Sequence, residues 1–111
     1  MTPAATPEQP WKTLYAAAEQ AVAHELWVDA EELLSQVLQL APEHASAHHL
    51  LGKTLEQQDE LVAALAAQQR SCALDPALGW NWFAAGELLL ELERPAEAAE
   101  AFDQALAALP A

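Results

Sequence analysis

The sequence predicts an all-α protein in which three antiparallel helix pairs stack into an α-solenoid, and three observations favour this fold class. Landmark residues recur every 34 positions: Pro42, Pro76 and Pro110; Ala18, Gly52 and Gly86; Ala30, Ala64 and Ala98. A period in this range is typical of stacked supersecondary units. The hydrophobic fraction is 53%, much of it alanine, which thin stacks of closely packed helices can bury. No run alternates polar with β-branched residues, which argues against a sheet.

The N-terminal segment, residues 1–10, is expected to be a flexible lead, because its proline, alanine and threonine resist helix formation and bury little. Thr6 and Gln9 have the spacing of a capping box, and proline is tolerated in a first turn. The first helix is therefore predicted to begin between Pro7 and Trp11 and to end near Glu25.

Five further helices are predicted from their apolar stripes and their boundary residues. Pro42 ends the second helix, Asp59 is suited to cap the fourth, and Pro95 is acceptable at the first position of the sixth. These helices are expected over residues 28–40, 44–58, 59–74, 77–92 and 95–108.

Each helix pair carries two small residues twelve positions apart, such as Gly52 and Ala64. Small side chains at these places let the two helices of a pair approach closely. The sequence thus predicts one domain over residues 11–111, with repeats of about 11–44, 45–78 and 79–111.

The charge balance is strongly acidic, with 17 Asp and Glu against 4 Lys and Arg and a formal net charge of -13. Proteins that bind nucleic acids neutralise phosphates with Lys and Arg, so no nucleic acid is expected as a partner. Anionic membranes are disfavoured for the same reason. An acidic surface either attracts cationic partners or keeps the protein soluble.

Cys72 is the only cysteine, which excludes an internal disulfide and fits the reducing cytoplasm, the predicted location. It stands in an apolar run, so an inert core thiol is expected. The N-terminus has no basic start followed by an apolar stretch and is not predicted to be a signal peptide. No segment approaches the roughly 20 apolar residues of a membrane span.

The pattern resembles the tetratricopeptide repeat family over about Trp11 to Pro110. That family's unit has a Trp, a Leu-Gly pair, an Ala, an aromatic residue, a second Ala and a closing Pro at a period of 34 residues. The third repeat matches it with Trp82, Ala85, Gly86, Ala98, Phe102, Ala105 and Pro110. The second repeat has His48 in place of the Trp and Gln68 in place of the aromatic residue, and the first has Ala17 and Ala18 in place of Leu-Gly.

The resemblance implies a right-handed superhelix whose concave face is lined by the first helix of each pair. Carried over by period, the groove candidates are Lys12, Tyr15, Glu19, His49, Lys53, Glu56, Trp80, Phe83, Glu87, Leu90 and Glu91. Aromatic surface beside carboxylates suits an extended or helical peptide with apolar anchors and Lys or Arg. The alternative for Trp80 and Phe83 is packing inside the repeat, the role expected for Trp82 and Trp27.

Some family members hold the carboxylate end of chaperone tails with cations on the groove-lining helices. The corresponding places here include Glu19, Leu50 and Ala84, none of which is a cation. Because Glu19 would repel a carboxylate, no binding of acidic tails is expected.

Metal and catalytic sites are not predicted. His44 and His48 are spaced to share a helix face, but no further ligand stands at a recognised spacing, so no metal or cofactor is expected. His48 is read instead as a core residue and His49 as a groove residue that titrates near neutral pH. The serines lack a nucleophile-elbow context, and the chain is not expected to be an enzyme.

Three functions remain open from the sequence. The first is an adaptor that captures a basic and apolar peptide of a partner protein in the groove. The second is self-association, because Phe102, Leu106 and Leu109 leave the last helix apolar without the polar cap that a stack of repeats needs. The third is a regulatory domain of a larger protein such as a transferase.

Overall fold

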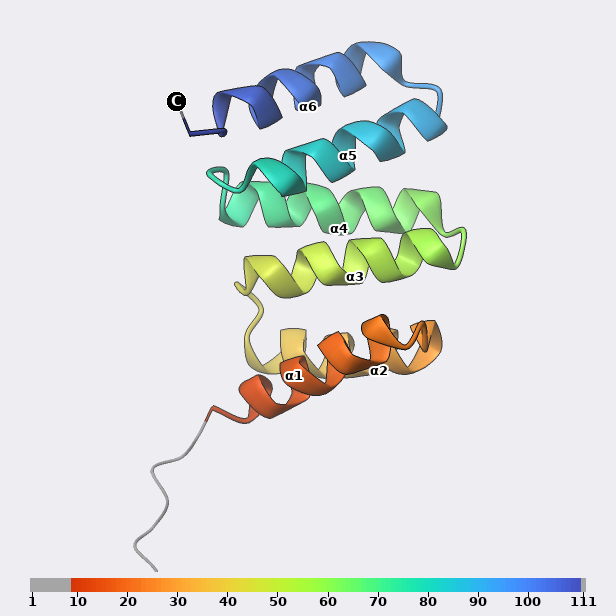
Figure 1. Cartoon of the computed structure of the whole chain (residues 1–111), viewed down its shortest axis with the longest axis vertical. Helices are drawn as coiled ribbons and strands as arrows, with labels where there is room; N and C mark the ends of the chain where they lie inside the picture. Colours follow the sequence, from red (N-terminus) through yellow and green to blue (C-terminus); the bar gives the residue numbers. More distant parts are fainter. Residues whose placement is uncertain (1–8, 111) are drawn as a thin grey trace, which may run out of the picture.

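The computed structural model describes residues 9–110 of the chain. Within this range it is all-helical and has no strand, with six helices: α1 Pro10–Ala23, α2 Trp27–Leu40, α3 Ala45–Gln57, α4 Leu61–Leu74, α5 Gly79–Glu91 and α6 Pro95–Ala107. They form three hairpins stacked along the long axis of the molecule (Figure 1). The predicted all-α solenoid of three antiparallel pairs is therefore confirmed.

Contacts between helices run almost entirely between neighbours in the chain. The two helices of each hairpin pack against each other, α2 packs on α3, and α4 packs on α5. Buried side chains form two apolar clusters, one around Leu34 and Val37 between α1, α2 and α3, and one around Leu65 and Leu88 between α3, α4, α5 and α6. Leu51 borders both clusters and joins them into a continuous core.

Small residues occupy the places where the helices of a hairpin meet. Ala18, Ala30, Ala64 and Ala98 have no exposed surface, and Gly52 and Gly86 are buried. A Cβ atom on Gly86 would come within 2.6 Å of the Phe102 ring, and one on Gly52 within 2.5 Å of the Gln68 amide. The predicted close approach at these positions is confirmed, because neither site has room for a methyl group.

The turn inside each hairpin holds a residue with a positive φ. Glu25, Asp59 and Glu93 have φ angles of 58°, 62° and 59°, one period apart. Each turn has the two hydrogen bonds of a Schellman motif; in the first, Glu25 N–H donates to Val22 O and Leu26 N–H to Ala21 O. Glycine is the usual residue at this position, so the three acidic residues fill a role that sequence preference does not assign to them.

The predicted cap at Asp59 is wrong for this reason. Asp59 adopts the left-handed conformation of the turn, and Glu60 is the N-cap of α4, with no side-chain hydrogen bond to the helix. At the first helix, Thr6 lies outside the described residues, and Gln9 is an N-cap that makes no side-chain hydrogen bond. His44 alone caps through its side chain, its Nδ1 accepting from Ala47 N–H at 3.0 Å.

Two ring nitrogens one period apart make the same contact. Trp82 donates from Nε1 to the carbonyl oxygen of Pro76 at 2.9 Å, and His48 donates from Nε2 to that of Pro42, also at 2.9 Å. Both rings are half-buried rather than core residues. The histidine thus replaces the tryptophan of the repeat because it keeps an N–H aimed at the proline carbonyl that closes the preceding repeat.

Candidate binding groove

A cleft of about 370 Å³ lies between α3 and α5, and it gathers six groove candidates of the second and third repeats, while Leu90 and Glu91 are not part of its lining. Its lining includes His49, Lys53, Glu56, Trp80, Phe83 and Glu87. Ala84, which occupies one of the places that lack the family's cation, lies one turn after Trp80 and completes the lining. We call this cleft the central groove.

His49 is held in the central groove by a buried amide of the neighbouring helix. Gln68 is 1% exposed, and its Oε1 accepts from His49 Nδ1 at 2.8 Å while its Nε2 donates to the His49 carbonyl oxygen at 3.0 Å. Burial lowers the pKa of His49, although the bond to Gln68 acts in the opposite direction. The two hydrogen bonds fix His49 as a wall of the groove, and its lowered pKa favours the neutral imidazole.

Two carboxylates, those of Glu56 and Glu87, line the central groove, and Glu91 lies close to Glu56. Burial, followed by the charges of Glu91 and Glu87, raises the pKa of Glu56, while Lys53 lowers it by a smaller amount. One lysine thus faces three glutamates. The surplus negative charge suits a Lys or Arg side chain of a ligand.

Aromatic surface borders the same carboxylates. Trp80 is 74% exposed, and Phe83 is 44% exposed and packs one side of its ring against Phe102, with the ring centroids 5.6 Å apart. The exposure of Trp80 argues against packing inside the repeat. Phe83 both packs inside the repeat and presents surface to the groove. These two side chains supply apolar contact area at the rim of the groove.

The first hairpin does not contribute to the central groove. Tyr15 packs against the His44 ring at a centroid distance of 4.8 Å, and burial together with the Glu19 carboxylate raises its pKa. Lys12 extends toward the Trp11 ring, 5.8 Å from its centroid. Lys12, Tyr15 and Glu19 therefore remain candidates for an extension of the groove along α1, separate from the cleft between α3 and α5.

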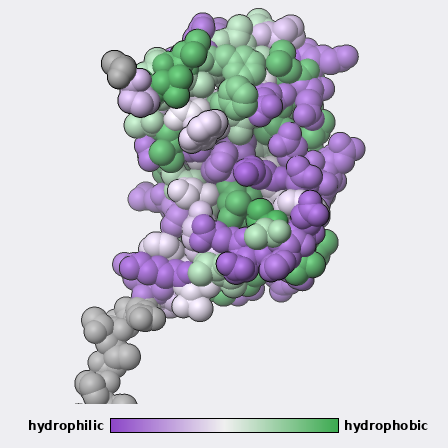
Figure 2. Space-filling model, in the orientation of Figure 1, coloured by the Kyte–Doolittle hydropathy of each residue, from purple (hydrophilic) through white to green (hydrophobic). Residues whose placement is uncertain are grey.

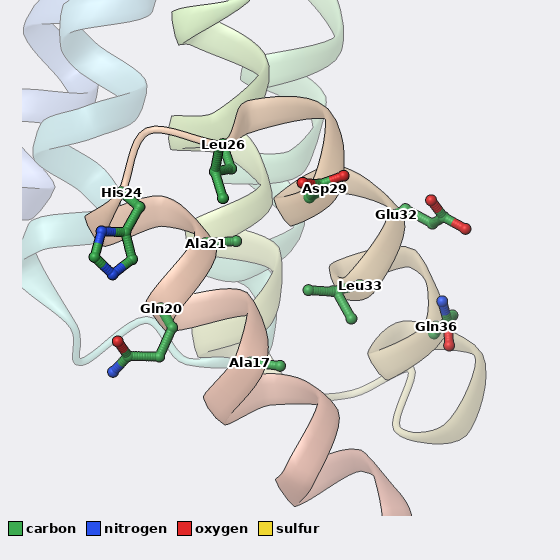
Figure 3. Close-up of a pocket in the computed structure, with 9 residues that line it drawn as sticks. All are labelled: Ala17, Gln20, Ala21, His24, Leu26, Asp29, Glu32, Leu33 and Gln36. Carbon is green, nitrogen blue, oxygen red and sulfur yellow. The ribbon is translucent and has the colours of Figure 1, made fainter.

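A second cleft opens between α1 and α2 at the N-terminal end of the stack, with a volume of about 510 Å³. Ala17, Ala21 and Leu33 point into it, while Gln20 and Glu32 point away from it (Figure 3). Its lining includes no Phe, Tyr or Trp and no Lys or Arg. The small floor and polar rim suit contact with solvent better than they suit a specific ligand.

A third cleft, of about 580 Å³, lies at the other end of the stack between the start of α5 and the end of α6. We call it the end cleft; its large lining residues are Leu78, Trp80, Phe83, Phe102, Leu106 and Leu109. Figure 2 shows hydrophobic side chains gathered at this end of the molecule, beside the C-terminus. Leu106 is 66% exposed and Leu109 is 57% exposed, as the sequence leads one to expect of an uncovered last helix.

Two nucleophilic side chains, Ser71 and Cys72, are buried within the helix packing, while Ser35 and Ser46 are exposed. Burial raises the pKa of the Cys72 thiol to about 11, which fits the expected inert core thiol. Ser71 is buried and donates from its hydroxyl to the Ala45 carbonyl oxygen at 2.7 Å, while accepting from the Asn81 amide. Over residues 9–110, no three His, Cys, Asp or Glu side chains are grouped to hold a metal ion, and no helix could cross a membrane.

Comparison with known proteins relates the third hairpin to a sequence family. The sequence model of the tetratricopeptide repeat family matches residues 81–110, which cover most of α5 and all of α6. No curated protein matches the sequence significantly.

Solved structures share the fold at low sequence identity. MamA from Desulfovibrio magneticus RS-1 has a TM-score of 0.84 at 22% identity, over 88% of this chain and 55% of that one. The Sgt2 tetratricopeptide-repeat domain from Aspergillus fumigatus has a TM-score of 0.85 at 19% identity, over 92% and 68% of the two chains. A mutant O-GlcNAc transferase from Thermobaculum terrenum has a TM-score of 0.83 at 26% identity, over 90% of this chain and 19% of that one. The chain thus spans little more than half of MamA and about a fifth of the transferase.

Proposed function

The chain carries tetratricopeptide repeats, with a family match at residues 81–110 in a fold that three such repeats account for, and from this premise we propose that it is a protein-interaction module. In this proposal the central groove binds a segment of a partner protein that combines Lys or Arg with apolar side chains. The supporting observation is that exposed aromatic surface and a surplus of carboxylates line one cleft between α3 and α5.

The ligand chemistry follows from the two parts of the groove. Trp80 and Phe83 offer rigid aromatic surface that an aliphatic side chain covers at little cost in conformational entropy. Glu56 and Glu87 lie on the facing helices α3 and α5, so a Lys or Arg side chain between them would approach both carboxylates. The net charge of -13 also favours fast association with cationic partners.

The related structures are consistent with this role. The structures of similar fold include a complex described as CopN-Scc3, which matches over 93% of this chain with a TM-score of 0.86 at 14% identity. That description concerns the complex itself, and we extend to this chain only the general idea of a helical-repeat surface that contacts another protein. The aromatic and acidic character of the ligand site is drawn from this chain's own residues.

A labelled peptide of alternating lysine and leucine tests the proposal, with fluorescence anisotropy at low salt as the readout. Trp80→Ala is expected to weaken binding about tenfold, because exposed aromatic anchors commonly carry more than ~1 kcal/mol of binding free energy. Val62→Ala, a substitution of a 72% exposed residue on α4, is the matched control and should leave affinity unchanged.

A peptide of alternating glutamate and leucine completes the test. It is expected to show no binding, because the carboxylates of the groove repel it. Unchanged affinity of the lysine peptide for folded Trp80→Ala protein, or equal affinity for the glutamate peptide, would contradict the proposal.

A further inference from the structure

The end cleft has two covered counterparts inside the same molecule. One period before Phe102, Ala105 and Leu106 stand Gln68, Ser71 and Cys72, which are at most 2% exposed. Ser71 and Cys72 lie against α5, which reaches Ser71 through a hydrogen bond from Asn81, while Gln68 packs against Gly52 of α3. The matching face of α6 leaves Leu106 66% exposed.

The corresponding face of α2, in the first hairpin, is covered in the same way. Leu34 and Val37 of α2 have no exposed surface, because Ala47 and its neighbours on α3 pack over them. This face is thus covered twice within the described residues, each time by a helix lying along it. The shape of the end cleft therefore suits a helix rather than an extended strand or a small molecule.

The charges around the end cleft favour a cationic occupant. Asp103 is exposed on α6, three residues before Leu106, while Arg94 is already paired with Glu97 at 2.6 Å. Glu87 lies one turn after Phe83 on α5 and remains exposed. A helix that buries its apolar face against Leu106 and Leu109 would therefore bring its flanks close to carboxylates.

We infer that the end cleft docks one amphipathic helix of a partner protein, with Leu, Ile or Phe on its buried face and Lys or Arg on its flanks. This site goes beyond the proposed function, because its floor is formed by α6, which lies outside the central groove. The two sites share Trp80 and Phe83, so one partner with a basic segment next to a helix can occupy both.

A second copy of this chain fits the end cleft poorly. Each copy carries a net charge of -13, so two copies repel each other. A cationic helix gains from the same charges. The observations therefore favour a different protein over a homodimer.

A helical peptide of leucine and lysine, with leucines at i, i+3, i+4 and i+7, is the probe, and isothermal titration calorimetry with the whole chain is the measurement. Leu106→Gln and Leu109→Gln are each expected to weaken binding about tenfold, because each removes apolar surface from the contact. Leu40→Gln, at a 52% exposed leucine near the end of α2, is the matched control and should bind as the unaltered protein does. Circular dichroism establishes that all variants stay folded.

A substitution of Glu56 in the central groove distinguishes the two proposals. Glu56→Gln is expected to weaken binding of the alternating lysine and leucine peptide. The affinity for the helical peptide should change by less than about twofold, because Glu56 lines only the central groove. Equal helix affinity in Leu106→Gln and Leu40→Gln would overturn the end-cleft inference and leave the groove proposal standing. A homodimer in analytical ultracentrifugation that Leu106→Gln dissolves would also overturn it, because the occupant would then be a second copy.

Discussion

At the scale of single residues, the carboxyl group of Glu56 links binding to stability. It is partly buried beside Glu91 and Glu87, and these surroundings raise its pKa above the ordinary value of 4.5. A raised pKa in the folded state means that Glu56 favours folding when protonated. Its stabilising contribution is complete below pH 4.5 and is lost as the pH rises through the folded-state pKa.

Glu56→Gln is accordingly expected to raise the unfolding temperature at pH 7, because the neutral amide removes the repulsion. The gain should be below ~1 kcal/mol, or up to about 5 °C, since much of the repulsion is screened by solvent. Thermal unfolding followed by circular dichroism at pH 7 and pH 4 measures it, and the difference between the variants should shrink at pH 4.

Glu32→Gln, at an exposed position on α2, serves as the control for general charge reduction. A lower unfolding temperature for Glu56→Gln than for Glu32→Gln at pH 7 would contradict the assignment of repulsion to this cluster. The same substitution should weaken binding of the basic peptide. Glu56 would therefore lower the stability of the fold while strengthening ligand binding.

At the scale of helices, each hairpin is built around one tight contact whose partners differ between repeats. Gly86 faces Phe102 in the third hairpin, and Gly52 faces Gln68 in the second. In the first, Ala18 and Leu34 stand at the corresponding positions within one buried cluster. In the first and third hairpins the smaller residue stands opposite the larger partner, since alanine faces leucine and glycine faces the larger ring; the second hairpin pairs glycine with glutamine.

Gly86→Ala is expected to destabilise the fold by about 1 to 2 kcal/mol, because overpacking against the ring outweighs the higher helix propensity of alanine. Combining it with Phe102→Leu recreates the pair found in the first hairpin. The double variant should lose less stability than the sum of the two single losses, as measured by urea unfolding. Losses that add within about 0.5 kcal/mol would show that the two positions are not coupled.

The hairpins and their contact points are predictable from the sequence because they depend on local sterics repeated at a fixed period. The helix starting at Pro95 and the small residues at Gly52 and Ala64 are examples. The predicted cap at Asp59 is wrong because Asp is favoured both as an N-cap and, among non-glycine residues, in the left-handed conformation that it adopts here. The signal that was available is the recurrence of acidic residues at Glu25, Asp59 and Glu93.

The candidate site is less predictable than the fold, because it depends on distances between helices far apart in the sequence. The period places His49 and Phe83 on one face, but it gives no sign that Gln68 holds His49 by two hydrogen bonds. It likewise extends the groove to Tyr15, whereas in the structure Tyr15 packs against His44. Repeat periodicity identifies a face of the stack and leaves open where that face becomes a cleft.

At the scale of the whole molecule, the net charge of -13 acts on stability and on binding in opposite ways. Like charges spread over a thin stack of hairpins repel one another and favour the expanded, unfolded chain. The same charges attract a cationic ligand. Salt weakens both effects, because the Debye length falls from about 30 Å at 0.01 M to about 8 Å at 0.15 M.

Raising the salt concentration over this range is therefore expected to raise the unfolding temperature by several degrees. It should also lower the affinity for the alternating lysine and leucine peptide about tenfold or more. Calorimetry at matched salt concentrations measures both. Sodium chloride avoids the added stabilisation that sulfate gives through exclusion from the protein surface. An unfolding temperature that falls with sodium chloride would show that attractive ion pairs dominate over repulsion.

The contacts that hold the stack together run between successive helices, and this has a mechanical consequence. The junction between α4 and α5 is the main seam joining the third hairpin to the rest. A slight pivot at that seam would carry Trp80 and Glu87 as one rigid unit relative to Lys53 and Glu56. The groove between α3 and α5 would then widen or narrow without unpacking either hairpin, so the same side chains could contact ligands of different width.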